Sequence, residues 1–187
     1  MNAASYGASG LDMDITHRTK VGDVGVRTKL LLSHLFDSYY DFGFGGGKET
    51  SMGKIGADDE VAFRNKVRLA FEANKGPWAA GLTFSWIPGY TDQTYTAGDA
   101  TVFLVNADGT TGAATAIERK VSSYMLVDLQ AKYALGKAST VLLTVKNLMD
   151  KDPPLSIKTV GGNMNGFDPR YHDGIGRSFT LQLSTRF

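Results

Sequence analysis

A glycine-rich stretch is the first segment of this chain whose residues could do chemistry. The run Asp41-Phe-Gly-Phe-Gly-Gly-Gly-Lys-Glu-Thr50 places glycines directly before a lysine, as phosphate-binding loops do. The Walker pattern needs a glycine six residues before the lysine and a serine or threonine directly after it. Phe42 and Glu49 occupy those two positions, and no βαβ pattern surrounds them. The segment is therefore predicted to be a surface loop, not a nucleotide site.

A second stretch could supply a nucleophile. Ser51-Met-Gly-Lys54 matches the Ser-x-x-Lys pattern of penicillin-recognising enzymes, in which the serine opens a helix. Here the pattern lies in a glycine-rich loop without the partner motifs, which favours a chance match. The chain also has no cysteine. That excludes disulfides, thiolate metal sites and thiol nucleophiles.

The three histidines do not have metal-site spacing. His17, His34 and His172 are scattered, with no pair four residues apart. Asp168, His172 and Asp173 share one predicted loop and could contact a hard cation, but a solvated polar loop is the simpler interpretation. The sequence therefore predicts no catalytic, cofactor-binding or metal-binding residues, no cofactor and no enzymatic activity.

Composition narrows the class of protein. The 187 residues include 20 basic and 19 acidic ones without a basic run, which gives no indication of a nucleic-acid partner. No apolar run reaches the length of a transmembrane helix. The mean hydropathy of −0.16 fits a soluble protein, and equally a membrane barrel in which only alternate residues meet lipid.

The clearest structural signal lies at the C-terminus. Phe179, Leu181, Leu183, Thr185 and Phe187 alternate with Ser178, Thr180, Gln182, Ser184 and Arg186. Strict alternation predicts a strand with one apolar and one polar face. A tilted strand of about ten residues is what spans a lipid bilayer in an outer-membrane barrel.

Six more segments alternate in the same way. The predicted strands are about 10–18, 23–36, 60–73, 77–90, 121–135, 138–148 and 177–187. Short turns join them at Val21-Gly-Asp, Asn74-Lys-Gly-Pro and Gly136-Lys137, and these alternate with connections 37–59, 91–120 and 149–176, each over twenty residues. Loops of this length are uncommon in compact soluble domains and routine on one face of bacterial barrels. The connection 91–120 is predicted to hold a hairpin of its own, turning at Asn106-Ala-Asp-Gly109.

The two faces of these strands have distinct chemistry. The polar parity holds the cations Arg18, Arg27, Lys29, Arg64, Arg68, Lys132, Lys146 and Arg186, and the anions Asp12, Asp14, Glu72 and Asp128. Such a basic wall could favour anionic ligands or an acidic partner surface, but any wide barrel has a charged, hydrated lumen. Trp78, Trp86, Tyr133, Phe179 and Phe187 lie near strand ends on the apolar parity, as interfacial aromatics do. In that parity Asn65 is a polar exception.

The C-terminal third resembles the end of TonB-dependent outer-membrane receptors. The matching stretches are Leu143-Thr-Val-Lys-Asn-Leu-Met-Asp-Lys-Asp-Pro-Pro154, Gly166-Phe-Asp-Pro-Arg-Tyr-His-Asp173, and Gly176-Arg177 with the final strand. Members typically show Asn-Leu-Phe-Asp where this chain has Met149 in place of the phenylalanine. Val121-Ser-Ser-Tyr-Met-Leu-Val-Asp-Leu-Gln and Gly10-Leu-Asp-Met-Asp-Ile are similar to earlier strands of the family.

The resemblance implies an all-β fold, an antiparallel transmembrane β-barrel of 22 strands with an N-terminal plug. Residues 1–187 would then be its last seven strands, without the plug or the TonB-contacting segment. The implied function is uptake of a scarce nutrient such as a siderophore, cobalamin or a sugar, in the outer membrane of a Gram-negative bacterium. The implied partners are membrane lipid, a small-molecule ligand, the TonB energy-coupling complex through the missing part, and the assembly machinery through the strand that ends at Phe187.

Two other interpretations stay open. One is a self-contained barrel of eight strands with a structural or adhesion role, in which residues 2–9 add a strand. The other is a soluble β-sandwich that acts as a binding module. The first residues, Met1-Asn-Ala-Ala-Ser-Tyr-Gly, are not a signal peptide, so a membrane barrel is expected to be either a mature chain or a piece of a longer one.

Overall fold

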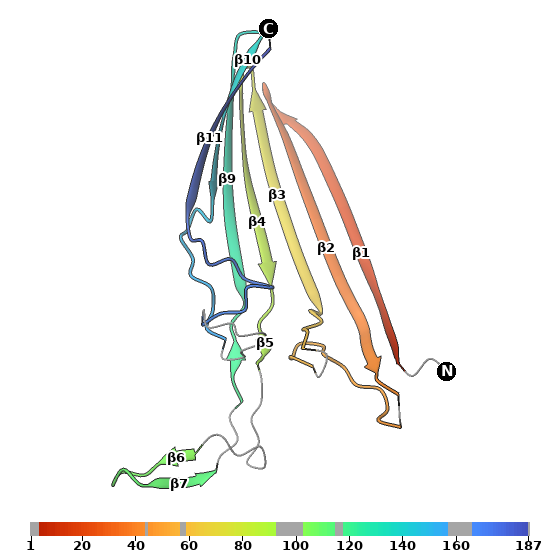
Figure 1. Ribbon diagram of the computed structural model, residues 1–187. Coiled ribbons are helices and arrows are strands. Elements are labelled where there is room, and N and C mark those ends of the chain that lie inside the picture. The colour runs from red at the N-terminus through yellow and green to blue at the C-terminus, as the bar shows by residue number, and fades with distance from the viewer. Residues whose placement is uncertain are drawn as a thin grey trace.

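The computed structural model describes residues 4–43, 45–56, 59–92, 103–114, 118–156 and 166–186. Within these residues the chain is all β, with a seven-stranded antiparallel sheet and no helix (Figure 1). The prediction of an all-β antiparallel fold is therefore confirmed. Across the described residues, no helix is long and apolar enough to cross a membrane.

Seven long strands form the sheet in the order β1-β2-β3-β4-β9-β10-β11. They are β1 (Ser5–Val21), β2 (Val24–Asp41), β3 (Asn65–Lys75), β4 (Trp78–Ile87), β9 (Tyr124–Leu135), β10 (Ser139–Lys146) and β11 (Ser178–Thr185). All seven predicted strands are present. Strands β1 and β2 run much further than expected, because their pairing continues past a register shift at Ser9/Gly10.

This longer β1 corrects the eight-stranded interpretation. Residues 2–9 were expected to add a separate strand, but residues from Ser5 onward continue β1 and pair with β2 as far as Asp41. A turn would be needed before Gly10 to start a new strand. The chain instead bulges there and keeps its direction.

The register keeps one apolar and one polar face across the sheet. Leu82, Leu129 and Val145 form a row on the apolar face across β4, β9 and β10. The adjacent row, Gly81, Gln130 and Thr144, belongs to the polar face. A shift of one residue would move a strand's whole apolar set to the other face, so this consistency shows that alternation sets the register.

Short turns and long connections leave opposite ends of the sheet (Figure 1). The turns after β1, β3 and β9 are short and place Gly22, Gly76 and Gly136 at positive φ. The long connections 42–64, 88–123 and 147–177 gather at the other end. The predicted alternation of short and long connections is therefore confirmed. Since Thr185 pairs with Ser139, β11 ends on the short-turn side; Phe187 itself lies outside the described residues.

The second long connection contains two small sheets. The first pairs β5 (Tyr90–Thr91) with β8 (Lys120–Val121). The other is a hairpin of β6 (Phe103–Val105) and β7 (Thr111–Ala114), which turns at Asn106–Gly109 as predicted and projects away from the main sheet (Figure 1). Gly109 has a φ of 79°, which suits a residue without a Cβ.

The apolar face of the sheet has no covering layer in the part of the chain that the structure describes. Several of its large side chains are open: Leu181 is 72% exposed, Phe179 69%, Trp78 61% and Met125 50%, whereas Phe84 and Trp86 are half-buried. Only two of its residues, Val127 and Val145, are buried. A β-sandwich would need a second sheet of comparable size packed on this face. The described strands provide none, so the β-sandwich interpretation does not describe this fold.

The hydrophobic core lies in the long connections, not on the sheet. Val61, Phe63, Tyr90 and Val121 are its buried members, and Ile55, Ile87 and Tyr171 pack against them. The sheet is thus a single curved layer with a compact group of loops at one end (Figure 1).

Candidate functional site

An aromatic cluster joins the three long connections. Phe63 comes from the first connection, Tyr90 from the second, and Tyr171 and His172 from the third. The Phe63 and Tyr171 rings meet edge to face with centroids 4.9 Å apart, and Tyr90 stacks on His172 at 6.2 Å. Edge-to-face pairs stabilise beyond the area they bury, so this cluster orders loops that would otherwise move independently.

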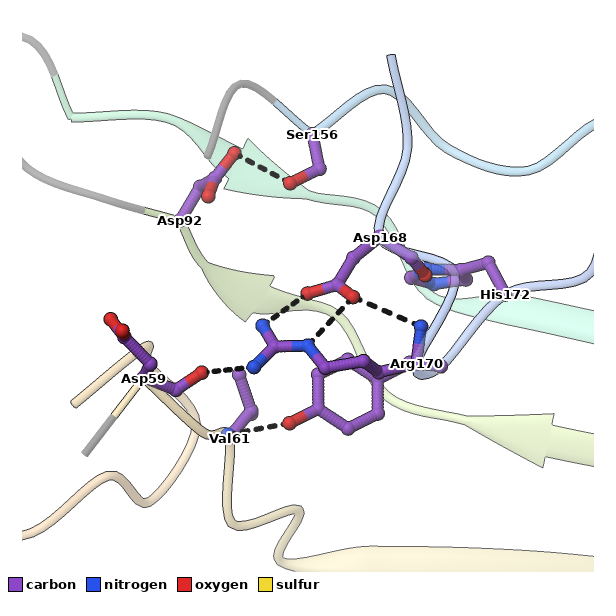
Figure 2. Close-up of polar contacts among 8 residues, drawn as sticks. Asp59, Val61, Asp92, Ser156, Asp168, Arg170 and His172 are labelled. Atoms are coloured by element: carbon purple, nitrogen blue, oxygen red, sulfur yellow. Dashed lines mark hydrogen bonds and ion pairs between the residues drawn. The ribbon is translucent and has the colours of Figure 1, made fainter. Parts of the chain in front are cut away.

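An arginine clasp lies beside the cluster (Figure 2). Arg170 Nη2 and Nε donate to the Asp168 carboxylate at 2.6 and 2.9 Å, and its Nη1 donates to the Asp59 carbonyl. The Asp168 residue is only 4% exposed. The clasp therefore ties the third connection to the first through a fork-shaped, charge-assisted contact.

The electrostatics of the clasp follow from burial and charge. Burial alone would raise the pKa of Asp168, but the hydrogen bonds and the positive charge of Arg170 outweigh it and hold the pKa below its ordinary value. The same carboxylate raises the pKa of Arg170. Both groups are therefore charged at neutral pH, and each stabilises the other.

Two further contacts complete the loop end. The Val61 N–H donates to the Tyr171 hydroxyl at 2.9 Å. The Ser156 hydroxyl donates to the Asp92 carboxylate at 3.1 Å, and both residues are at most 5% exposed (Figure 2). Each contact joins two different long connections, so the polar bonds and the aromatic cluster act on the same three segments.

A groove of about 360 Å³ lies on the polar face where the sheet meets these loops. Its floor comes from β2, β3, β4 and β9, and its wall includes Tyr171 and Asp173. Apolar side chains dominate the lining, while Lys66 and Arg68 add positive charge. Pockets of this size and composition hold small organic molecules.

The turn after β10 has the geometry that its sequence indicates. Asn147 and Asp150 have φ values of 49° and 52°. The Asn147 side chain bonds the backbone of Lys151 at both N and O, and the Asp150 carboxylate accepts the Arg177 N–H at 2.9 Å. Gly176, at a φ of 76°, then leads the chain into β11. These residues therefore end β10 and set the direction in which β11 begins.

The stretches first considered for catalysis have no catalytic setting. In the glycine-rich stretch, Asp41 accepts the Gly43 N–H at 2.7 Å as an ordinary side-chain turn, and residue 44 lies outside the described residues. Ser51 and Lys54 lie in irregular chain with isolated bridges at Met52 and Lys54, not on a helix. Neither stretch takes part in the arginine clasp.

The histidines are kept apart. His17 lies in β1, and His34 in β2 hydrogen-bonds Asn65 at 2.7 Å, which explains the polar exception on the apolar parity. His172 bonds the Asp168 carbonyl, and Asp168 is already held by Arg170. No group of three potential metal ligands occurs among the described residues. Asp168 and His172 are 4% and 5% exposed, so the prediction of a solvated polar loop is wrong for these two residues, which belong to an internal clasp.

The predicted basic wall is partly neutralised. Arg27 pairs with Glu72 at 3.3 Å, and Lys29 pairs with Asp14 at 3.0 Å. Arg64 and Arg186 lie outside the strands. Elsewhere on this face, Arg68 and Lys132 lie in register with Leu31 and Leu142. The face is thus mixed, and two of its cations, Lys66 and Arg68, lie at the groove.

The aromatic cluster and the arginine clasp together form one group of packed loop residues, the loop cluster. Sequence reasoning missed most of the residues that build it. Phe63, Tyr90 and the adjacent pair Arg170-Tyr171 are far apart in the chain, and no periodic pattern connects them. The available signal was the run Asp168-Pro-Arg-Tyr-His172, in which an acid, a base and two rings are close together inside a long connection. Buried charges need partners, and the nearest candidate partner for Asp168 is two residues away.

Acid is expected to loosen this loop cluster in two steps. Burial lowers the pKa of His172, so the neutral imidazole stabilises the fold fully above its unfolded pKa of about 6.5, and this is lost as pH falls through the lower folded pKa. Asp168 adds a second loss below about pH 4, since its folded pKa is also lowered. Hydrogen exchange of residues 166–177, corrected for intrinsic rates, should show both steps. His172→Phe should remove the first step while His17→Phe retains it; an unchanged first step in His172→Phe would contradict this assignment.

No family model, curated protein or solved structure matches this chain.

Proposed function

We propose that this chain forms part of the membrane-embedded barrel of a TonB-dependent receptor, which takes up a scarce nutrient across the outer membrane of a Gram-negative bacterium. The observation that carries this proposal is the open apolar face of the sheet. Seven adjacent strands keep their apolar side chains on that face, and Trp78, Phe179, Leu181 and Leu183 are each more than half exposed. An open apolar surface of this extent suits lipid better than water.

The dimensions support a lipid-facing surface. Trp78 and Trp86 belong to the apolar face at opposite ends of β4. At about 3.3 Å per residue their Cα atoms are roughly 26 Å apart along the strand. At a strand tilt of about 40° this length covers about 20 Å of height, which is most of the apolar band of about 25 Å that aromatic residues border in an outer-membrane barrel. Trp78 also contacts the Tyr133 ring, with a centroid distance of 4.3 Å.

The sheet edges favour a larger barrel. β1 and β11 each pair with one neighbour among the described strands. Unpaired strand edges are not tolerated in a bilayer, so we expect further strands to pair with both of them. In this arrangement the polar face lines the lumen and the long connections face outward. The self-contained eight-stranded barrel is less well supported, since residues from Ser5 onward extend β1.

The outward loops and the lumen would serve ligand capture, not covalent chemistry. By its resemblance to the receptor family, the chain would act with an energy-coupling complex, and the strand that ends at Phe187 would be read by the assembly machinery. The clasp, the aromatic cluster and the Ser156–Asp92 hydrogen bond fasten the three long connections, which gives the outer side a fixed shape. A fixed shape lowers the entropy cost of binding a ligand.

Tryptophan depth provides a direct test. Two variants of the full gene product, in which Trp78 or Trp86 is kept and every other tryptophan is replaced by Phe, should each be quenched by bromines near the headgroups when reconstituted with brominated lipids. Bromines at the bilayer centre should quench less, because each remaining ring lies near one interface. Cell fractionation should place the protein in the outer membrane and resistant to carbonate. Recovery in the soluble fraction, or no quenching at any depth, would reject the proposal.

A further inference from the structure

Charged and apolar side chains lie next to one another on the floor of the groove on the polar face. Arg68 on β3 lies directly opposite Leu31 on β2 and Ser85 on β4, and Ser85 lies opposite Leu126 on β9. One pleat further along, Ile87 faces Tyr124. The floor therefore offers two cations, Arg68 and Lys66, among apolar side chains.

The wall of the groove is held in place before any ligand arrives. Tyr171 accepts the Val61 N–H and packs against Phe63. Tyr124 donates from its hydroxyl to the carbonyls of Lys151 and Asp173, both at 3.2 Å. These rings cannot turn away without breaking the contacts that organise the loops, so the groove is preformed.

The two cations of the groove, Lys66 and Arg68, both lie on β3. In the described part of the chain, Lys66 and Arg68 form no ion pair, whereas Arg27 and Lys29 each have an acidic partner. The lining contains one acid near them, Asp173, whose carboxylate accepts the Ile175 N–H at 2.9 Å. The groove therefore keeps a net positive charge without a neutralising partner on the floor.

We propose that this groove binds an amphipathic organic anion, whose carboxylate lies on Arg68 and Lys66 and whose aromatic or acyl part lies among Leu31, Leu126 and Tyr171. A guanidinium binds a carboxylate with two parallel hydrogen bonds, which fixes the orientation of the ligand. The volume of about 360 Å³ suits one or two fused rings. The inference rests on the proposed function only for the route by which the ligand reaches the lumen.

Naphthoate and its neutral counterpart naphthylmethanol provide the test, with calorimetry on the full gene product in detergent micelles. Naphthoate should bind at one site and the alcohol at least tenfold more weakly. Arg68→Gln should weaken naphthoate at least tenfold, Lys66→Gln less, and neither should affect the alcohol. Lys132→Gln removes a cation from the same face outside the groove and should leave both affinities unchanged. Equal binding of the two probes, or an unaffected Arg68→Gln variant, would overturn the proposal.

Two controls keep this result separate from the proposed membrane function. Heat-modifiable migration on a gel shows whether each variant is folded, and raised salt should weaken naphthoate on the unaltered protein even if a variant misfolds. If the unaltered protein fractionates with the outer membrane but does not bind naphthoate, the groove proposal alone is rejected. Selective binding by a protein found in the soluble fraction rejects the membrane location alone.

Discussion

Leu129→Arg is expected to prevent stable insertion of this chain into the outer membrane. Leu129 lies in the middle of β9 on the apolar face, in one row with Leu82 and Val145. An arginine on the lipid side near the bilayer midplane costs about 2–4 kcal/mol. Since natural proteins are stable by only about 5–15 kcal/mol, the protein level in the outer membrane should fall steeply.

The neighbouring residue supplies the matched control. Gln130 lies on the polar face between Gly81 and Thr144 and is exposed. Gln130→Arg adds the same side chain to the same strand, and we expect a change within about 0.5 kcal/mol. Urea titration of folded protein in lipid vesicles would measure both variants. Equal losses for the two would mean that the faces do not differ in environment, contrary to the proposed location.

Arg170→Gln is expected to release the long connections from one another. The change leaves the buried Asp168 carboxylate without its fork of donors and the Asp59 carbonyl without this contact. A charge left unpaired in a buried position costs about 1–3 kcal/mol or more, reduced here because Arg170 is partly exposed. The opening equilibrium of the loops should therefore increase about tenfold or more, seen as faster protease cleavage within residues 147–177.

Arg177→Gln tests whether the loop opening expected for Arg170→Gln depends on the burial of the ion pair. Arg177 lies 3.7 Å from Asp150 in an ion pair whose side chains are both about half exposed. Exposed pairs contribute little, so cleavage should change less than twofold. If both variants open the loops equally, the clasp is not the contact that fastens them. Restoration of slow cleavage in the double variant Asp168→Asn/Arg170→Gln would support the unpaired charge as the cause.

The sheet could be predicted because its information is local. The two-residue period of Leu129, Ala131 and Tyr133 shows which side chains share a face, and one face that avoids water fixes the register. The hairpin could be predicted for a similar local reason, because its turn needs a residue at positive φ and the sequence places Gly109 there. The ends of β1 and β2 were missed, because a bulge at Ser9/Gly10 breaks the period without ending the pairing.

The loop cluster could not be predicted in the same way. Val61 and Tyr171 meet across 110 residues of sequence, and no repeat or spacing connects them. The three long connections meet at one end of the sheet only once the strands have paired. The same holds for the groove, since Leu31, Arg68 and Leu126 become neighbours through the pairing of four strands.

Spin labels along β9 would test most directly whether the apolar face meets lipid. These 187 residues have no cysteine, so single cysteines at positions 128 to 133 can be labelled without background once any cysteine elsewhere in the full gene product is replaced by serine. In outer membranes that contain the full gene product, labels replacing Leu129, Ala131 and Tyr133 should collide with oxygen and avoid a water-soluble nickel reagent. Labels replacing Asp128, Gln130 and Lys132 should show the opposite. Equal nickel access at all six positions, or the reverse alternation, would contradict a lipid-facing apolar side.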